Sequence, residues 1–296
     1  MQSNHTRQVA GVAAKLGLKV STSKLISHDN KLNSRYPSRY LGFSNSIFQA
    51  KLVQEHWVDW TDPGYSKVGN IQLSRMMGAA PRLDPSEFGI GHKQTLANLT
   101  KEVIAEGGKP YYIPAGASDH PLGGLGFARW AFEVQEQEKE LGVFFDTIIV
   151  CAVTGSTFAG IIAGFKLVEK LGGEKRRVVG IDASAKPQET REQVLRIAKF
   201  TAVKIGLVEE DITEKDVELD ERFHDGCYGI PGEMTKAAMK FGAETEGFIT
   251  DPVYEGKSLA GMMSMVKNGD IPAGSTVLYA HLGGQLALNA YSELFL

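Results

Sequence analysis

The chain has 296 residues, which is long enough for two lobes. Of these residues 43% are hydrophobic and 23% are charged, which is the composition of a globular protein. Its net charge of -3 gives no electrostatic reason to expect a nucleic acid or an anionic membrane as partner. The sequence has two cysteines, no metal-binding Cys/His spacing and no apolar run of the roughly 18 residues that span a membrane, so we expect a protein of the reducing cytoplasm without a metal.

The N-terminal stretch predicts a helix. Residues 8–18, QVAGVAAKLGL, place Val9, Val12 and Leu16 on one helical face. Ser3 and Asn4, just before them, are typical N-cap residues. An α/β domain that opens on a loop and a helix has no first strand for that helix to pack against, so we expect that upstream sequence is missing.

Residues 20–49 interrupt this pattern. The segment is rich in Ser and Asn, has no sustained periodicity, and stands where a short helix-to-strand loop belongs. The segment begins with Val, whose codons start with GT, and ends with Gln, whose codon is often CAG. These codons match the ends of introns, which begin with GT and end with AG. We therefore hypothesise a retained intron or a gene-model error, and the alternative is a genuine disordered insertion.

From residue 50 onward, strands and helices alternate. Strands are expected at 50–55, 81–83, 110–114, 147–153, 177–182, 216–219 and 276–281, and helices at 65–77, 92–105, 124–140, 157–171, 187–205, 232–245 and 257–267. This order is typical of an α/β protein with parallel sheets covered by helices on both faces. The Gly-dense stretch 115–126 is the expected connection between a smaller lobe, 1–118, and a larger lobe, 119–296.

The stretch 146–160, DTIIVCAVTGSTFAG, is the strongest candidate site. A buried strand ends at Thr154, Gly155, Ser156 and Thr157, and a helix follows. Unpaired N–H groups and hydroxyls at a helix N-terminus can hold the phosphate of a nucleotide or of pyridoxal 5'-phosphate (PLP). Neither nucleotide fingerprint, G-x-G-x-x-G or G-x-x-x-x-G-K-[ST], is present. An ordinary strand-to-helix turn with a Ser/Thr cap is the alternative.

Other strand ends should lie at the same edge of the sheet, where ligands bind in parallel α/β folds. They are residues 182–184, 251–258 and 281–284. The segment 251–258 sets the Tyr254 phenol beside the Glu255 carboxylate, although both are also typical of a solvated turn before a helix. We expect His281 to be a buried histidine with satisfied hydrogen bonds, and not a base.

Seven motifs carry a resemblance to a known family. They are QSNHTRQVA, IPAGASDHPLGGLGF, CAVTGSTFAG, GIDASAKP, CYGIPGE, TDPVYEGKS and YAHLGG, in this order. Together they resemble 1-aminocyclopropane-1-carboxylate (ACC) deaminase, over essentially the whole chain except residues 20–49. The resemblance implies the two-lobed type II PLP-dependent fold, of the tryptophan-synthase-β-like kind, a small amino-acid substrate, and a homo-oligomer.

The resemblance also implies roles for individual residues. The family's phosphate cradle is matched by Val153, Thr154, Gly155, Ser156 and Thr157. Asn4 matches the residue that contacts the pyridine 3'-oxygen, and Glu255 matches the carboxylate that faces the ring nitrogen and keeps it protonated. Ser3, Tyr228 and Tyr254 match groups on the substrate side.

ACC has no hydrogen on Cα, so Cα proton abstraction is unavailable to a PLP enzyme that opens its ring. Ring opening needs either a nucleophile at a ring methylene or a base for its proton, together with an electron sink. Tyr254 is the candidate nucleophile or acid/base, Tyr228 its partner, and Ser3 a base or a substrate clamp. The products would be 2-oxobutanoate and ammonia.

The nearest alternative within this fold is a D-cysteine desulfhydrase-like lyase. Relatives of that kind tend to have a small hydroxyl residue in place of Glu255 and Thr in place of Leu282, on the cofactor side. The pair Glu255 and Leu282 therefore favours ACC deaminase.

One departure from the family concerns the lysine that anchors the cofactor. The family carries it in a G-G-N-K-x-R-K stretch, and the sequence has no such stretch. Lys19, Lys186 and Lys257 are interpreted as ordinary surface or turn lysines. We therefore expect little or no deaminase activity from this polypeptide, and a non-catalytic PLP-binding protein is the alternative.

Overall fold

The computed structural model describes residues 2–16, 51–55, 58–84 and 94–296. The predicted insertion at 20–49 therefore lies outside the described residues. The chain divides into two compact units, one made of residues 1–56 and 66–112 and the other of residues 57–65 and 113–296. Compactness does not test independent folding, so the lobe boundary expected after residue 118 stays a prediction.

The first unit contains a parallel pair of strands and three helices. They are α1 (Asn4–Lys15), β1 (Lys51–Glu55), α2 (Asn70–Met76), β2 (Ala80–Asp84) and α3 (Gln94–Ala105). In the strand pair, Lys51 stands opposite Ala80. Ala10 of α1 packs with Leu52 of β1 and with Ala79, which forms the small core of this unit.

The strand expected at 110–114 is not formed, so this prediction was wrong. Residues 110–114 have no regular secondary structure, and Tyr111 is 70% exposed. Pro110 and Pro114 lack the N–H that a sheet ladder requires, so this apolar stretch cannot pair as an inner strand.

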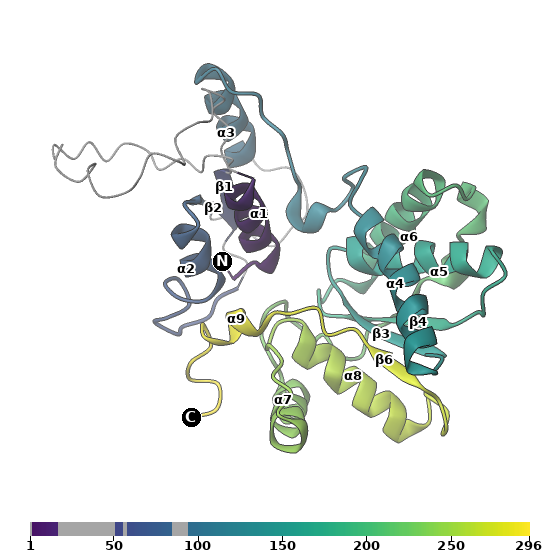
Figure 1. Cartoon of the computed structure of the whole chain (residues 1–296). Coiled ribbons are helices and arrows are strands. Elements are labelled where there is room, and N and C mark those ends of the chain that lie inside the picture. The colour runs from purple at the N-terminus through teal and green to yellow at the C-terminus, as the bar shows by residue number, and fades with distance from the viewer. Residues whose placement is uncertain (1, 17–50, 56–57, 85–93) are drawn as a thin grey trace. The chain divides into compact units, whose positions relative to one another are not determined.

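The second unit is built on a four-stranded parallel sheet (Figure 1). Its strands are β3 (Thr147–Ala152), β4 (Arg177–Asp182), β5 (Glu218–Asp220) and β6 (Val277–Tyr279), in the order β5-β4-β3-β6. Its helices are α4 (Leu125–Leu141), α5 (Ser156–Lys170), α6 (Pro187–Lys204), α7 (Glu233–Glu246), α8 (Glu255–Asn268) and α9 (Gln285–Leu288). Because all the strand pairs are parallel, the carboxyl ends of these strands meet at one edge of the sheet.

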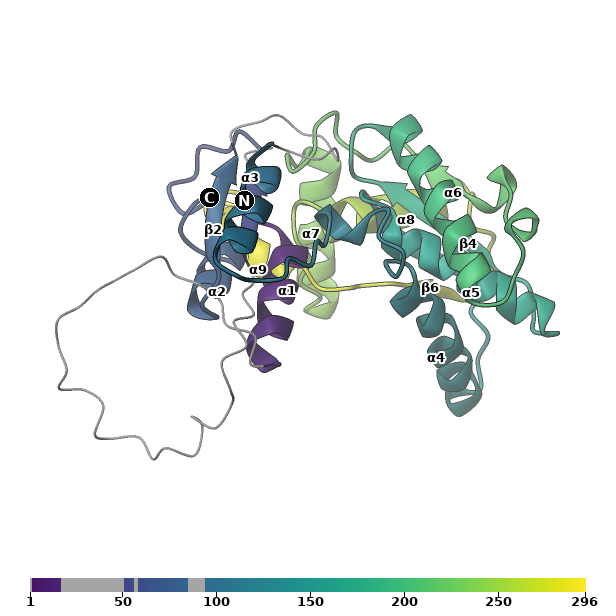
Figure 2. The same cartoon turned by 90° about the horizontal axis from the view of Figure 1, so that it is seen from above.

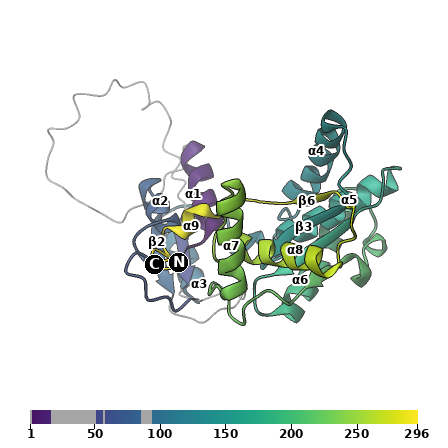
Figure 3. The same cartoon turned by 90° about the horizontal axis from the view of Figure 1, so that it is seen from below.

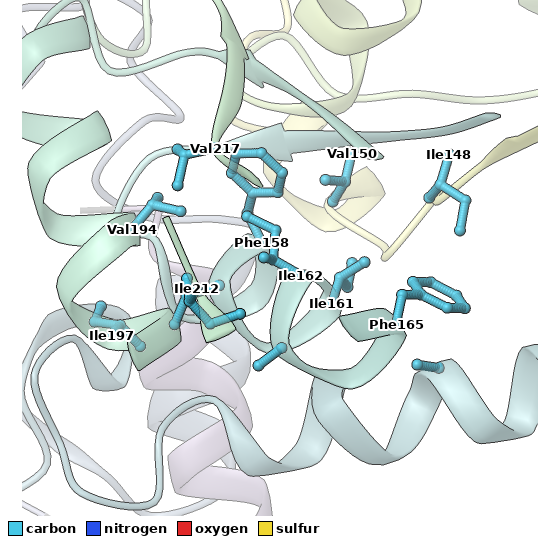
Figure 4. Close-up of a cluster of buried hydrophobic side chains, with 14 of the residues drawn as sticks. Ile148, Val150, Phe158, Ile161, Ile162, Phe165, Val194, Ile197, Ile212 and Val217 are labelled. Carbon is cyan, nitrogen blue, oxygen red and sulfur yellow. The ribbon is translucent and has the colours of Figure 1, made fainter. Parts of the chain in front are cut away.

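One face of this sheet is covered by α4, α5 and α6 (Figure 2). Ile148 and Val150 of β3 pack against apolar side chains of α5, among them Phe158 (Figure 4). Gly180 of β4 makes room for this ring, because a Cβ there would lie 2.4 Å from Cε1 of Phe158. The small residue in the strand is thus matched to the aromatic ring in the helix.

The opposite face is covered by α7 and α8 (Figure 3). Ile149, Val179 and Ile181 point to this side and pack with Leu259 and Met265 of α8. Alternate residues of β3 therefore enter different cores, and the nearly unbroken apolar run of this strand follows from burial on both faces. The expected α/β class, with parallel sheets covered by helices, is confirmed.

The segment 58–65 packs against the C-terminal residues of the same unit. The ring of Tyr291 lies 4.9 Å from that of Trp60 and 5.5 Å from that of Tyr65, between ring centroids. The hydroxyl of Tyr291 donates to the carbonyl oxygen of Gly229 at 2.8 Å. These contacts support the loop that carries Tyr228. None of the helices in the described part of the chain combines the length and apolar character needed to cross a membrane.

Candidate active site

The turn after β3 joins a strand end to a helix N-terminus. Gly155 adopts a left-handed conformation with φ of 87°, and α5 begins at Ser156. The carbonyl oxygen of Thr154 accepts hydrogen bonds from Ser118 Oγ at 2.6 Å and from Gln193 Nε2 at 2.7 Å. Because C=O and N–H point in opposite directions across a trans peptide, the N–H of Gly155 points away from these two donors.

The Gly-dense stretch 115–126 lies against this turn. A Cβ on Gly116 would come within 1.9 Å of Oγ1 of Thr154, and one on Gly123 would lie 3.2 Å from Oγ of Ser156. Glycine is therefore needed for the close approach, independently of any role at a lobe boundary. Sequence reasoning missed Ser118 and Gln193 as supports of the turn, because neither is near it in sequence.

Ser156 provides the most informative atom of the turn. The residue is 5% exposed, and its Oγ has no hydrogen-bond partner among the described residues. Val153 is buried beside it, and Thr154 and Thr157 are half-buried. Since a buried hydroxyl normally has a partner, an unpaired one at a helix N-terminus fits an anionic ligand such as a phosphate.

The start of α8 carries the second part of the site. The buried carboxylate of Asp251 accepts backbone N–H groups from Val253 and Tyr254 at 2.9 Å and from Glu255 at 3.1 Å. Gly284 allows this arrangement, because a Cβ there would lie 2.2 Å from Oδ2 of Asp251. A carboxylate of the protein itself thus holds the first turn of α8.

Glu255 is the first residue of α8 and is only 4% exposed. Its Oε1 accepts the N–H of Leu282 at 3.3 Å, and its Oε2 accepts the hydroxyl of Tyr279 at 3.1 Å. Burial raises the pKa of this carboxyl group to about 8, with a further contribution from the charge of Asp251. A buried carboxyl group of this kind is stabilised by a cationic partner or by one that shares its proton.

The sheet brings this carboxylate to the same edge as the turn after β3. Tyr279 of β6 stands opposite Ile149 of β3, and its hydroxyl donates to the carbonyl oxygen of Glu255 at 2.6 Å. Cys151, near the end of β3, has its pKa raised by burial and then by the charge of Glu255. The turn 154–157 and Glu255 therefore both lie near the carboxyl ends of the neighbouring strands β3 and β6.

Tyr228 and Tyr254 form a pair, and Tyr254 directly precedes Glu255 in the chain. Their hydroxyl groups are hydrogen-bonded to each other, and the ring centroids are 6.0 Å apart. Burial is the main cause that raises the pKa of each phenol above its usual value. Both phenols therefore stay protonated at neutral pH, so the pair can donate and pass on a proton.

Ser3 and Asn4 lie in the first unit. Ser3 is the N-cap of α1, and its Oγ accepts the N–H of Thr6 at 3.2 Å. The side-chain oxygen of Asn4 accepts a hydrogen bond from Nδ2 of the buried Asn70 at 2.6 Å. Ser3 therefore has the capping contact that its residue type predicts, and its substrate-side role stays a prediction.

Lys257 is not a surface or turn lysine, so this interpretation was wrong. It is 0% exposed, and its Nζ donates to the carbonyl oxygens of His224 at 2.7 Å and Cys227 at 2.9 Å. The sequence showed a lysine after a turn, but helix packing encloses it. Lys186 is a turn residue that pairs with Glu189 at 3.6 Å, as expected, whereas Lys19 lies outside the described residues.

The loop after β6 completes the edge. The Nε2 of His281 is 2.8 Å from the carbonyl oxygen of Ile249, so the expected hydrogen bonding is found, but the residue is half-buried and the expectation of a buried histidine was wrong. Leu282 is 38% exposed and supplies the N–H that meets Glu255. Gly283 and Gly284 adopt left-handed conformations with φ of 116° and 96°, which suits a backbone that lies near a flat ligand.

These residues fit PLP. The unpaired Ser156 hydroxyl and the helix N-terminus suit its phosphate, and the buried Glu255 carboxyl suits its ring nitrogen. No group of three or more His, Cys, Asp or Glu side chains within the described ranges is placed to hold a metal ion.

Comparisons with known proteins agree with this fit. Residues 53–283 match the family described as "Pyridoxal-phosphate dependent enzyme". The chain is 54% identical, over 297 aligned residues, to the "Probable 1-aminocyclopropane-1-carboxylate deaminase" of Cryptococcus neoformans var. neoformans serotype D (strain JEC21 / ATCC MYA-565). The alignment covers 100% of this chain and 75% of that relative.

Solved structures show the same fold. A crystal structure of an ACC deaminase homologue is similar with a TM-score of 0.74 and 25% identity, over 99% of this chain and 74% of that one. The O-ureido-L-serine synthase structure is similar in fold alone, with a TM-score of 0.55 and 15% identity over 94% of this chain and 69% of that one. The resemblance seen in the sequence motifs is confirmed.

Proposed function

Because the chain belongs to the pyridoxal-phosphate dependent enzyme family, we propose that its site is built to open the ring of ACC with PLP as cofactor, giving 2-oxobutanoate and ammonia. The observation that carries the proposal is the hydrogen-bonded pair of Tyr228 and Tyr254, of which Tyr254 directly precedes the buried Glu255 in the chain. It combines a phenol that can react with the substrate and a partner for the cofactor nitrogen.

Glu255 is assigned to the cofactor ring. PLP supplies an electron sink, which is strongest when its ring nitrogen is protonated. The pKa of about 8 places the Glu255 carboxyl group where it can share that proton, and the two hydrogen bonds from Leu282 and Tyr279 fix its orientation.

The tyrosine pair is assigned to the substrate. A substrate without a Cα hydrogen must be opened at a ring methylene, so Tyr254 would serve either as the nucleophile that attacks this carbon or as the base that takes its proton, while the cofactor would accept the electrons that are released. Tyr254 directly precedes Glu255, and Tyr228 can return a proton to it through their shared hydrogen bond. The raised pKa of both phenols keeps them neutral at rest, so the proton of Tyr254 would leave only as this residue attacks the substrate or takes its proton.

The phosphate is assigned to the turn after β3. The Ser156 hydroxyl and the N–H of Gly155 supply donors, and the dipole of α5 adds positive potential. Val153, Thr154 and Thr157 form the surrounding turn. Asn4 remains assigned to the 3'-oxygen of the cofactor ring, and Ser3 to the substrate, from the motifs alone.

The cofactor-anchoring lysine has no counterpart in the printed sequence. No residue stands in a G-G-N-K-x-R-K stretch, and the buried Lys257 is engaged with two carbonyl groups. We therefore expect the 296-residue polypeptide by itself to bind PLP reversibly and to turn over little substrate.

Binding and product formation test the proposal together. PLP is titrated into the purified chain, and ACC and D-cysteine are added separately while the cofactor absorbance is followed. We expect ACC to change the absorbance at lower concentration than D-cysteine, and the small amount of 2-oxobutanoate that the wild-type chain forms to fall further in Tyr254→Phe. The matched control is Tyr111→Phe, at a 70% exposed tyrosine. A stronger response to D-cysteine would favour the lyase instead, and an absence of PLP binding would contradict the proposal.

A further inference from the structure

Lys257 occupies an unusual position for a lysine. It lies on the first turn of α8, two residues after Glu255 and three after Tyr254, and is 0% exposed. A buried ammonium group is costly unless hydrogen bonds replace the water that it has lost. Two carbonyl oxygens, those of His224 and Cys227, do so at 2.7 and 2.9 Å.

The surroundings of this ammonium group are acidic. Burial lowers the pKa of this ammonium group, and the charges of the Asp225 and Asp182 carboxylates act against that shift and favour the charged form. The cation therefore sits between α8, the end of the sheet and the loop 224–227.

The bond to Cys227 controls the next residue in the chain. The carbonyl group of Cys227 belongs to the planar peptide that leads into Tyr228, so holding this oxygen fixes the orientation of that peptide. On the other side of Tyr228, the carbonyl oxygen of Gly229 is held by the hydroxyl of Tyr291 at 2.8 Å. Tyr228 is thus held on both sides.

The same loop is fastened to α7 at an earlier point. The hydroxyl of Thr235 donates to Asp225 at 2.5 Å, and the N–H of Gly226 donates to Nδ1 of His224 at 2.8 Å. These bonds shape the loop, but they do not tie it to α8. Lys257 does, and α8 begins directly after Tyr254.

We propose that Lys257 is a positioning residue, which ties the loop 224–227 to the first turn of α8 and so keeps the Tyr228 hydroxyl on that of Tyr254. The proposal rests on the function proposed above, in which this tyrosine pair serves the substrate. A displacement of about 1 Å at a reacting group can lower a rate about a hundredfold, so a bond from outside the pair has a measurable effect.

The test uses Lys257→Met, which keeps an unbranched side chain one atom shorter than lysine and removes its donors. The matched control is Lys240→Met on α7, where the lysine side chain is 64% exposed. Three quantities are measured on the full chain: backbone amide hydrogen exchange across residues 224–229, the Kd for PLP, and the ACC concentration that half-saturates the absorbance change. The same measurements on Tyr228→Phe, with and without Lys257→Met, show whether the lysine acts through this tyrosine.

We expect Lys257→Met to speed amide exchange in residues 224–229 about tenfold or more relative to the wild type. The Kd for PLP should stay within about twofold of the wild-type value, and the ACC concentration that half-saturates the absorbance change should rise about tenfold. In the Tyr228→Phe background, Lys257→Met should leave the ACC concentration unchanged. Unaltered exchange in the loop, exchange accelerated throughout the unit, or an undiminished effect in the Tyr228→Phe background would each overturn the proposal.

Lys257→Gln keeps the test decisive if the methionine variant does not fold. Gln retains one donor group on a shorter side chain, so it should hold the loop less well than lysine does. We therefore expect amide exchange in residues 224–229 to be faster in Lys257→Gln than in the wild type. Exchange at the wild-type rate would contradict the proposal. If wild-type chain does not bind PLP or respond to ACC, the proposed function fails, whereas the exchange data still decide whether Lys257 clamps the loop.

Discussion

The candidate site contains the N-termini of two helices, α8 and α5, which differ in how their backbone N–H groups are capped. The first turn of α8 is held by Asp251, whose carboxylate accepts three backbone N–H groups. The first turn of α5 follows a left-handed Gly155 that makes no side-chain cap, and its Ser156 hydroxyl has no partner within the described residues. Both turns carry the partial positive charge of a helix N-terminus.

The difference separates a structural helix end from one that can bind a ligand. At α8 the protein supplies the anion, and the turn becomes a rigid support for Tyr254 and Glu255. At α5 the donors remain available to an anion from solution. Changes at Asp251 should therefore affect stability first, and changes at Ser156 should affect cofactor affinity first.

The largest effect is expected from Asp251→Ala. Three N–H groups at a buried helix end would lose their acceptor, and we expect the free energy of unfolding to fall by about 3 kcal/mol. Urea denaturation measures this change, with Asp59→Ala as an exposed control that should change stability by less than about 0.5 kcal/mol. A stability equal to that of the wild type would show that the Asp251 carboxylate does not hold the turn.

Ser156→Ala should have the reverse profile. The hydroxyl has no protein partner to lose, so the melting temperature should stay unchanged, while the Kd for PLP should rise about thirtyfold, or about 2 kcal/mol, through loss of a hydrogen bond to a charged group. Absorbance titration measures the Kd, and Thr245→Ala on α7 removes an exposed hydroxyl as control. If stability fell and affinity did not, the turn would be a structural one.

The pH dependence of stability also tests the start of α8, with an effect that is smaller per pH unit. The pKa of Glu255 rises from 4.5 to about 8 on folding, so the folded chain holds more protons between these pH values. The stabilisation is complete below the lower value and is lost as pH rises through the higher one, by up to about 1.4 kcal/mol per pH unit. Glu255→Gln should remove this part of the slope, and Glu244→Gln, at a side chain 66% exposed, should keep it. Equal slopes in both variants would contradict a buried, proton-binding Glu255.

The regular elements could be predicted from the sequence, because they follow from local patterns. The strand expected at 177–182 is observed at those residues, and the apolar run before Thr154 forms β3. The strand expected at 110–114 failed because two prolines outweigh three apolar residues. Short-range patterns carry such information, whereas side-chain burial depends on residues that are remote in sequence.

The site shows the same limit. A Gly/Ser/Thr turn after a buried strand marks a place for an anion, so the turn 154–157 could be proposed from sequence. The burial of Lys257 could not, because its acceptors lie at residues 224 and 227, 33 and 30 positions away. The contact of Ser118 with Thr154 spans 36 positions and left no local signal. The substrate-side assignments came from the resemblance, and they still need a test.

The most direct test of the account is a crystal structure of the chain with PLP bound. We predict that the phosphate lies within hydrogen-bond distance of Ser156 Oγ and the N–H of Gly155, and that the ring nitrogen faces the Glu255 carboxyl group. A phosphate bound elsewhere, or a ring nitrogen directed at a different side chain, would contradict the account.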